Sequence, residues 1–234
     1  MDTKVTRNFT YGLFVITAKD GDKLNGCIIN TGIQAASDPL TVAVSLNKAD
    51  YTCDMIMKTG EFNLTFLSED AKFETFKHFG FQSGKDVNKF SKEAAVDASD
   101  GNDVTVSSGK ESGDTLAKFE YKLAANDIPY ITTGANAYLS AHVTKSVDLG
   151  SHMMFIAEIT DAEVFSKTPS VSYSYYFANI KPKPEAKATE ADAAGEKKVG
   201  WICTICGYIY PHEELPADYI CPICKHPASD FKKL

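Results

Sequence analysis

The sequence of 234 residues has no long hydrophobic run and only one tryptophan. No apolar stretch reaches the roughly 18–20 residues that a membrane helix needs, and the polar segment 1–10 lacks the apolar core of a signal peptide. We therefore expect no membrane association and a cytoplasmic location. Acidic residues outnumber basic ones by 31 to 24, so the net charge is −7 and no nucleic-acid partner is expected. A hydrophobic content of 44% excludes a mainly disordered or collagen-like chain.

Cysteine is scarce outside 200–234, where four of the six cysteines form two Cys-x-x-Cys pairs. Two such pairs can converge on one tetrahedral metal ion, and four thiolates select zinc or iron. A disulfide framework is the alternative, which a reducing compartment disfavours. A segment this short also needs a metal to fold, because its own core is too small. The predicted metal ligands are Cys203, Cys206, Cys221 and Cys224.

A stretch without aromatic residues separates this segment from the rest of the chain. Residues 180–199, IKPKPEAKATEADAAGEKKV, contain five lysines and four acidic residues and almost no apolar residue beyond Ala. Such a composition buries too little surface to become ordered. We predict three parts: a block at 1–179, a flexible linker at 180–199 and a small domain at 200–234.

The block at 1–179 is predicted to be mainly β, with short helices between its strands. Asp50 is expected at the start of a helix that runs to Lys58 and ends at Gly60, and a second helix is expected over 70–79. Because long helices do not alternate with the strands, a closed antiparallel barrel fits better than a parallel sheet. The polar run 91–115 is expected at the surface. Alternating residues predict strands at 9–18, 27–34, 40–46, 61–67, 116–125, 137–143 and 153–165.

Polar residues gather where two of these predicted strands end. The block has no nucleophile elbow and no Gly-rich phosphate loop. Hydroxyls, amides, one lysine and a helix N-terminus nevertheless suit the recognition of a phosphate and a polar ring. Each residue taken singly is a solvated strand end. The candidates are Asn30, Thr31 and Gln34 on one strand, Ser45, Asn47 and Lys48 on the next, and Thr52 in the helix that follows.

The two lone cysteines and several histidines and tyrosines have structural explanations. Cys27 and Cys53 lie in apolar surroundings, where a thiol acts as a small hydrophobic group, so neither is assigned a catalytic role. His142 lies within a predicted strand and is expected to be structural or exposed. The tyrosines of SYSYYF at 172–177 are expected to pack against the barrel or a dimer partner.

The segment WICTICGYIYPHEELPADYICPICKHPASDF resembles rubredoxin, through Trp201, Tyr210 and Phe231 around its cysteine pairs. The resemblance implies one iron in the four-Cys site, with aromatic side chains that keep water away from it. The interval between the pairs is shorter than in free-standing rubredoxins and resembles the tail of rubrerythrins. Lys225 stands where that family usually has Gly. A zinc ribbon is the alternative.

The block at 1–179 is similar to the flavin reductase-like, FMN-binding split-barrel family. The runs TRNFTYGLFVIT, LNGCIINTGIQAASDPLTVAVSLNKADYT, FGFQSGKDVNKF and DLGSHMMFIAEITDAEV carry the resemblance. It implies a split β-barrel that forms a homodimer, with FMN at the subunit interface. NADH or NADPH is the implied donor, and it would dock on the flavin because the chain has no Gly-x-Gly-x-x-Gly.

The same resemblance assigns roles to the polar candidates. Residues 30–34 would lie along the flavin ring, and the residues from Ser45 to Thr52 named above would hold the ribityl phosphate. His152, in the Gly-x-His that begins at Gly150, would lie at the flavin and nicotinamide site and is the catalytic candidate. Without the resemblance it would be an ordinary edge histidine. The 79–90 loop would border the site with Asp86, Lys89 and Phe90, while Lys85 stands where Arg is common.

Together the two parts predict an electron-transfer flavoprotein. Bound FMN accepts a hydride and releases single electrons, whereas a rubredoxin iron takes one electron at a time. The layout resembles the high-molecular-weight rubredoxin family, which implies delivery to a flavodiiron oxygen or nitric oxide reductase. One alternative is a flavin reductase that releases reduced FMN and carries a zinc-ribbon or docking tail. Another is a flavin-free barrel with a zinc ribbon.

Overall fold

The computed structural model of the chain describes residues 2–90, 103–108, 117–182, 200–203, 209–221 and 227–233. The chain divides into two compact units, Met1–Lys181 and Pro182–Leu234. Most of the predicted linker, and most of the predicted surface run 91–115, lie outside the described residues. Within the described ranges, no helix combines the length and the apolar character needed to span a bilayer.

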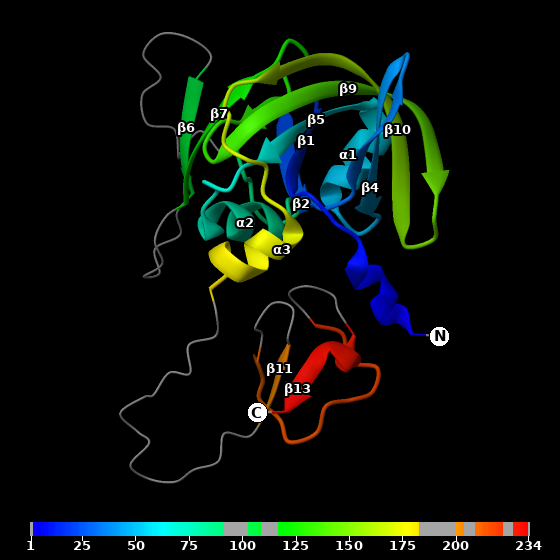
Figure 1. Cartoon of the computed structure of the whole chain (residues 1–234), viewed down its shortest axis with the longest axis vertical. Coiled ribbons are helices and arrows are strands. Elements are labelled where there is room, and N and C mark those ends of the chain that lie inside the picture. The colour runs from blue at the N-terminus through cyan, green and yellow to red at the C-terminus, as the bar shows by residue number, and fades with distance from the viewer. Residues whose placement is uncertain are drawn as a thin grey trace. The chain divides into compact units, whose positions relative to one another are not determined.

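Antiparallel strands dominate the first unit, as predicted (Figure 1). The main sheet has seven strands in the order β2-β1-β5-β9-β10-β4-β3, and a smaller sheet has the order β6-β7-β8. The main sheet contains β1 (Phe14–Asp20), β2 (Lys23–Ile29), β3 (Gly32–Ser37), β4 (Leu40–Asn47), β5 (Glu61–Leu67), β9 (Ala135–Asp148) and β10 (His152–Val164). The smaller sheet contains β6 (Asp103–Ser108), β7 (Ala117–Leu123) and β8 (Pro129–Ile131).

The helices lie on both sides of the main sheet. The strands curve around α1, whereas α2 and α3 lie below the sheet in Figure 1. Helix α1 follows Asp50 and ends at Gly60, whose φ of 73° is the left-handed conformation that favours glycine. These ends agree with the predicted start and stop signals. The helices are η1 (Thr3–Asn8), α1 (Tyr51–Thr59), α2 (Phe73–Gly80), α3 (Tyr173–Tyr175) and the short π-helix η3 (Tyr176–Ile180).

The prediction of a closed barrel is wrong for the strands that the structure describes. The seven-stranded sheet is open, and β2 and β3 form its two edges. On β2, the carbonyl oxygen of Gly26 accepts a hydrogen bond from Lys89 Nζ at 2.8 Å. A buried lysine side chain therefore contributes to satisfying this carbonyl of the edge strand.

The predicted strand at 27–34 is two strands in the structure. Its first half belongs to β2, which pairs with β1, and its second half belongs to β3, which pairs with β4. The Thr31 hydroxyl donates to the Ser45 carbonyl at 2.6 Å, where the chain passes from one pairing partner to the other. The predicted strand at 9–18 likewise begins only at Phe14.

Successive side chains of β1 point to opposite faces of the sheet and pack into two different apolar clusters. Phe14 and Ile16 point into a cluster shared with α1, whereas Val15 points into a second cluster shared with α2 and β7. All three side chains are buried. The sheet is therefore covered on both faces around β1.

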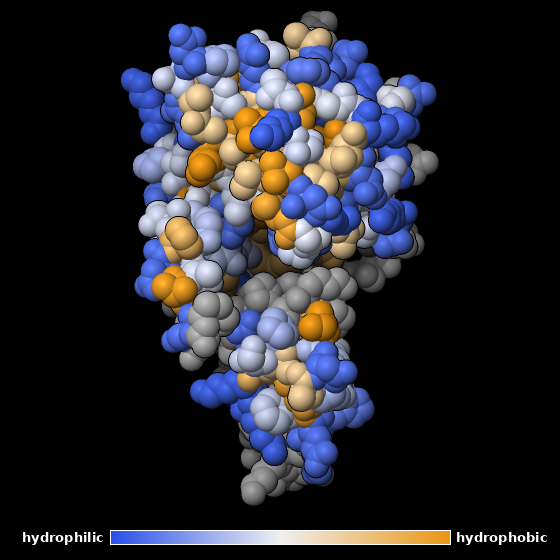
Figure 2. Space-filling view, turned by 90° about the vertical axis from the view of Figure 1, so that its right-hand side faces the viewer, coloured by the Kyte–Doolittle hydropathy of each residue, from blue (hydrophilic) through white to orange (hydrophobic). Residues whose placement is uncertain are grey.

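One face of the first unit carries exposed apolar side chains. Figure 2 shows this face, which lies on the right-hand side in Figure 1, beside the β9–β10 hairpin. The exposed large apolar residues of the unit include Ile33 on β3, Leu40 on β4 and Leu149 in the β9–β10 turn. Their exposed fractions are 67%, 45% and 51%.

The second unit is a small three-stranded sheet in the order β12-β11-β13. Its described core consists of buried Cys203, Cys221 and Phe231, with four partly buried large side chains packed against them. Those four are Trp201, Tyr210, Leu215 and Tyr219. The elements are β11 (Trp201–Cys203), β12 (Ile209–Tyr210), η4 (Ala228–Asp230) and β13 (Phe231–Lys233).

Candidate functional site

Three strands bring several of the candidate polar residues together. Strand β10 pairs with β4 so that His152 lies opposite Asn47 and Met154 lies opposite Ser45. The Ser45 N–H also donates to the Thr31 carbonyl at 3.2 Å, which completes a two-way link between the start of β3 and the end of β4. Thr31, Ser45, Asn47 and His152 are all half-buried. The strand register thus gathers hydroxyl, amide and imidazole groups at one end of the sheet.

Lys48 joins this group to the turn between β9 and β10. Its Nζ lies 2.5 Å from Asp148 Oδ1, and its backbone N–H donates to the Ser151 carbonyl at 3.1 Å. Asp148 also accepts from the Gly150 N–H at 2.8 Å. The pair with Lys48 and this backbone bond lower the pKa of the Asp148 carboxyl. The turn before His152 is therefore fixed to the end of β4 by one side-chain contact and one backbone contact.

The imidazole of His152 has one ring nitrogen in contact with its neighbour. Ser151 Oγ lies 2.9 Å from His152 Nδ1. If the hydroxyl donates to Nδ1, then Nε2 carries the proton and acts as the donor to a ligand. His142, in contrast, is exposed and pairs with Glu61 Oε1 at 2.6 Å, as its structural interpretation predicts.

Helix α1 begins directly after this group. Asn47 accepts from the Ala49 N–H at 2.9 Å, which forms the turn into the helix. Asp50 occupies the N-cap position, but its side chain makes no capping hydrogen bond. Burial raises the pKa of the Asp50 carboxyl, and the Lys89 ammonium opposes this rise. The first backbone N–H groups of α1 are thus left without a side-chain cap next to Lys48, which suits a phosphate.

Two of the predicted site residues, Gln34 and Thr52, form their side-chain hydrogen bonds outside this group. Gln34 is exposed on β3, and its amide donates to the Ala36 carbonyl at 3.3 Å. Thr52 is fully buried, and its hydroxyl accepts from Asn25 Nδ2 at 2.9 Å. Asn30 is half-buried between β2 and β3, next to Thr31. The roles of all these residues toward a flavin stay predictions.

The 79–90 loop is held to the sheet by a buried charge. Only 2% of the Lys89 side chain is exposed, and its Nζ donates to the Gly26 and Phe79 carbonyls at 2.8 and 3.0 Å. Burial lowers the pKa of Lys89. At the same place, His78 Nε2 lies 3.0 Å from the Lys89 carbonyl oxygen. Phe90 is buried in the apolar cluster around α2, so neither Lys89 nor Phe90 borders an open site within this chain.

Cys27 and Cys53 are buried thiols, as their apolar surroundings predict. Their exposed fractions are 8% and 2%. Burial raises the pKa of Cys27 to about 12 and that of Cys53 to about 11. Neither thiol is therefore ionised near neutral pH, which agrees with the absence of a catalytic assignment.

In the second unit, two of the predicted metal ligands lie at the centre of the core. Cys203 and Cys221 are fully buried, and Phe231 lies opposite Cys203 in the β11–β13 pair. The other two predicted ligands, Cys206 and Cys224, lie outside the described residues, as does Lys225. A core this small that places two sulfurs at its centre has the donor chemistry of a thiolate metal site. The part of the chain that the structure describes contains no group of three or more metal-binding side chains.

Sequence reasoning missed three residues that support these sites. Asp148 holds Lys48, Asn25 holds Thr52, and Tyr219 packs 4.4 Å from Tyr210 and 5.5 Å from Phe231, measured between ring centroids. The Asp-x-Gly of the β9–β10 turn was a usable signal for Asp148. For Asn25 and Tyr219 the contacts are between distant positions, and no local pattern indicates them.

Comparison with known proteins gives two family matches. The flavin reductase like domain matches residues 6–182, and the rubrerythrin, rubredoxin-like domain matches residues 201–232. A high molecular weight rubredoxin of Moorella thermoacetica is 32% identical over 255 residues, which cover 100% of each chain. A ferric-chelate reductase (NAD(P)H) of Archaeoglobus fulgidus is 29% identical over 189 residues, which cover 81% of this chain and 96% of that protein.

The solved structures agree at the level of the fold. The NADH:FAD oxidoreductase of Streptomyces globisporus superimposes with a TM-score of 0.55 at 16% identity, over 72% of this chain and 84% of that one. The first family covers most of the chain, and the Moorella protein matches it from end to end. The chain therefore belongs to the flavin reductase-like family and carries a C-terminal rubredoxin-like domain.

Proposed function

We propose that this protein is an FMN-dependent NAD(P)H oxidoreductase that passes single electrons to an iron site in its own second unit. From there the electrons would go to a partner protein, for which a flavodiiron oxygen or nitric oxide reductase is the candidate. The two relatives, a high molecular weight rubredoxin and a ferric-chelate reductase (NAD(P)H), support this combination. A bound flavin would supply hydride acceptance and one-electron release, and a four-thiolate iron would supply a one-electron carrier.

The observation that carries the proposal is the β4–β10 register, which places His152 opposite Asn47 and next to Lys48. Lys48 and the uncapped N–H groups of α1 would hold the phosphate of FMN. The hydrogen bond from the Thr31 hydroxyl to the Ser45 carbonyl keeps β3 and β4 in register. The polar residues of both strands would then face one ligand. His152, oriented by Ser151, would donate a hydrogen bond from Nε2 at the ring where the nicotinamide docks.

The iron site would be held by Cys203 and Cys221 together with Cys206 and Cys224. The buried position of the first two excludes water from the sulfurs, and the packed aromatic side chains extend this shield. Exclusion of water lowers the local dielectric and tunes the potential of a thiolate-bound iron. The homodimer and the cytoplasmic location stay predictions. The exposed apolar face of Figure 2 would serve as the contact surface of such a dimer.

Anaerobic stopped-flow mixing with NADH tests the proposal on the full-length protein. Flavin absorbance should fall first, and the ferric-thiolate band should fall in a second phase. Cys221→Ser should remove the second phase and leave the first, while Cys53→Ala, a buried cysteine of the first unit, should keep both. An iron that stays oxidised beside reduced flavin would refute the internal transfer. A yellow protein that contains zinc would instead favour the flavin reductase with a zinc-ribbon tail.

A further inference from the structure

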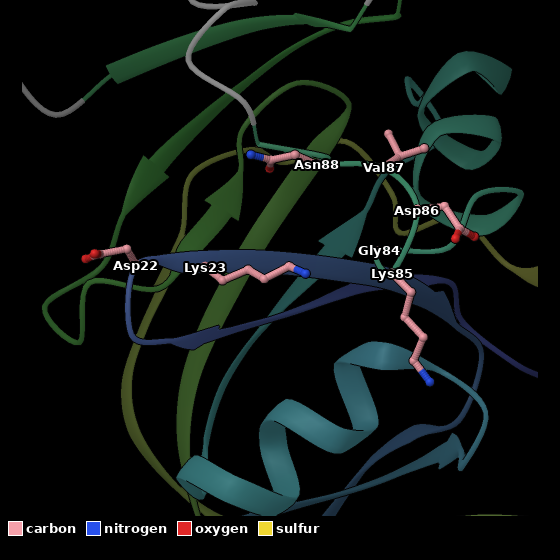
Figure 3. A pocket seen from close by; sticks show the side chains of 7 residues that line it. All are labelled: Asp22, Lys23, Gly84, Lys85, Asp86, Val87 and Asn88. Atoms are coloured by element: carbon pink, nitrogen blue, oxygen red, sulfur yellow. The ribbon is translucent and has the colours of Figure 1, made fainter.

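Lysine ammonium groups near the start of α1 already have partners within the chain. In Figure 3 the Lys85 side chain extends toward α1, where its Nζ lies 3.5 Å from Asp54 Oδ2. The hollow beside Lys85 is lined by two lysines and two aspartates, so it offers an anion no net positive charge. Lys89 is buried, and its ammonium donates to two carbonyl groups. An anion that binds at this end of the unit is therefore expected to rely on Lys48.

Lys48 has a partner as well, and this partner is an acid. Its Nζ lies 2.5 Å from Asp148 Oδ1, and the same oxygen accepts a hydrogen bond from the Gly150 N–H at 2.8 Å. The two side chains are 38% and 61% exposed, so water screens the pair and its net contribution to stability is small. The phosphate of a ligand can therefore take the ammonium from Asp148 at little cost.

Backbone hydrogen bonds hold the β9–β10 turn without this ion pair. The Lys48 N–H donates to the Ser151 carbonyl at 3.1 Å, and the Leu149 N–H donates to the His152 carbonyl at 2.9 Å. His152 also lies opposite Asn47 in the β4–β10 pair. The Lys48 side chain can thus change its partner while the backbone around His152 stays in place.

After such an exchange, Asp148 is a second anion beside the phosphate. The hydrogen bonds from Lys48 and from the Gly150 N–H lower the pKa of the Asp148 carboxyl, and an aspartate with an ordinary pKa is also ionised at neutral pH. Two anions then share one ammonium group, and the repulsion between them weakens the binding of the phosphate. A flavin without a phosphate meets no such repulsion.

We propose that Asp148 determines how strongly this protein distinguishes FMN from riboflavin, because its carboxylate competes with the phosphate of FMN for Lys48. The inference rests on the proposed function, in which Lys48 holds that phosphate. The exchange moves one ammonium group between two anions, and no covalent bond, proton or electron is transferred. Asp148 thereby lowers the affinity for a phosphorylated flavin and leaves the affinity for the ring and ribityl chain unchanged.

Flavin binding to the flavin-free, full-length protein tests this competition. FMN and riboflavin are each titrated by flavin fluorescence at about pH 8, where the phosphate is doubly ionised. Asp148→Asn keeps an oxygen that accepts from the Gly150 N–H but removes the charge. It should bind FMN about fivefold more tightly and riboflavin within about twofold of the wild-type affinity. Riboflavin binding also reports that the ring site of the variant is intact.

Asp127→Asn is the matched control. It breaks another exposed Asp–Lys pair, with Lys19 at 3.4 Å, in the turn before β8. Both flavin affinities of this variant should stay within about twofold of the wild type.

A measurement on the wild-type protein needs no variant. The pKa of the Asp148 carboxyl is followed by carboxyl-carbon NMR in the flavin-free protein and in its two flavin complexes. FMN should raise this pKa, because it removes the Lys48 contact and adds a nearby negative charge. Riboflavin should leave it unchanged.

Two results would overturn the inference. One is an FMN affinity of Asp148→Asn that equals the wild-type affinity or falls below it. The other is an Asp148 pKa that FMN does not change. If the wild-type protein binds FMN no more tightly than riboflavin, and Lys48→Met binds FMN equally well, the phosphate site of the proposed function is refuted together with this inference. Electron transfer is not measured here, so an iron that stays oxidised would refute the internal transfer alone.

Discussion

The close approach of Gly84 to Asn25 gives a sharp prediction about the 79–90 loop. A Cβ atom at position 84 would lie 2.2 Å from Asn25 Oδ1 and 2.4 Å from its Cγ. Asn25 has little room to retreat, because only 2% of it is exposed and its amide donates to Thr52. Gly84→Ala should therefore displace the loop or break the Asn25–Thr52 hydrogen bond.

Overpacking of this kind costs about 1–3 kcal/mol of the free energy of unfolding. For a unit of this size, each kcal/mol lowers the melting temperature by about 2–4 °C. Gly80→Ala is a matched control, because a Cβ there would meet Ile28 at 3.4 Å, an ordinary van der Waals contact. Gly80 also ends α2, where Ala has the better helix propensity, so its loss of stability should stay within about 0.5 kcal/mol.

The single tryptophan makes the assay selective. Trp201 belongs to the second unit, whereas nearly all of the helix and long strands belong to the first. Far-ultraviolet circular dichroism should therefore report the lower melting temperature of Gly84→Ala, while Trp201 fluorescence should show an unchanged transition. Loss of stability in both signals equally would mean that the substitution acts through the whole chain.

A double-mutant cycle tests whether a side chain at position 84 contacts Asn25 directly. Asn25→Ala removes the atoms that the new methyl group would strike, at the cost of the hydrogen bond to Thr52. The double variant Asn25→Ala/Gly84→Ala should therefore be less destabilised than the sum of the single variants by more than about 0.5 kcal/mol. Additive losses would refute the direct contact between these two positions.

Three further predictions concern titration and charge. Burial lowers the pKa of His78 from 6.5 to about 4, so the neutral imidazole contributes to the free energy of unfolding above pH 6.5 and this contribution is lost as the pH falls toward 4. In urea titrations at several pH values, His78→Gln should remove up to roughly 3 kcal/mol of this loss of stability in acid. Burial raises the pKa of Cys27 from 9.0 to about 12, so the neutral thiol contributes to the free energy of unfolding below pH 9 and this contribution is lost as the pH rises toward 12. Cys27→Val should reduce this loss of stability at high pH, and an unchanged dependence of stability on pH would contradict the raised pKa of Cys27. Lys48→Met breaks an exposed ion pair with Asp148, which solvent screens, so the melting temperature should stay nearly unchanged. The same substitution should weaken flavin binding about tenfold in a fluorescence titration, and equal flavin affinity would remove Lys48 from the phosphate site.

Local signals predicted the parts of the fold that depend on neighbouring residues. The start of α1 after Asp50 and its end at Gly60 follow from chain chemistry within a few positions. The gathering of Ser45 and Asn47 follows from the alternation along one strand. His152 pairs with Asn47 across two strands, although the two residues lie about a hundred positions apart in the sequence. Only the family resemblance indicated that they share a site.

Lys89 shows why other features escaped sequence reasoning. A lysine is expected at the surface, but this one is buried, because two carbonyl groups, on β2 and at the end of α2, accept hydrogen bonds from its ammonium group. Those acceptors lie 63 and 10 residues away in the chain. The same contact occupies a carbonyl of β2, an edge strand of the main sheet.

The strand order of the main sheet also determines when the first unit can become complete during synthesis. Before β9 and β10 exist, the sheet consists of two separate pieces, β2-β1-β5 and β4-β3, which share no hydrogen-bonded pair. Strand β9 pairs with β5, and β10 pairs with β4, so the hairpin from residues 135 to 164 joins the pieces. A ribosome-bound chain that ends before this hairpin would therefore expose the unpaired edges of β5 and β4 in addition to those of β2 and β3, and exposed strand edges of this kind favour aggregation unless a chaperone covers them.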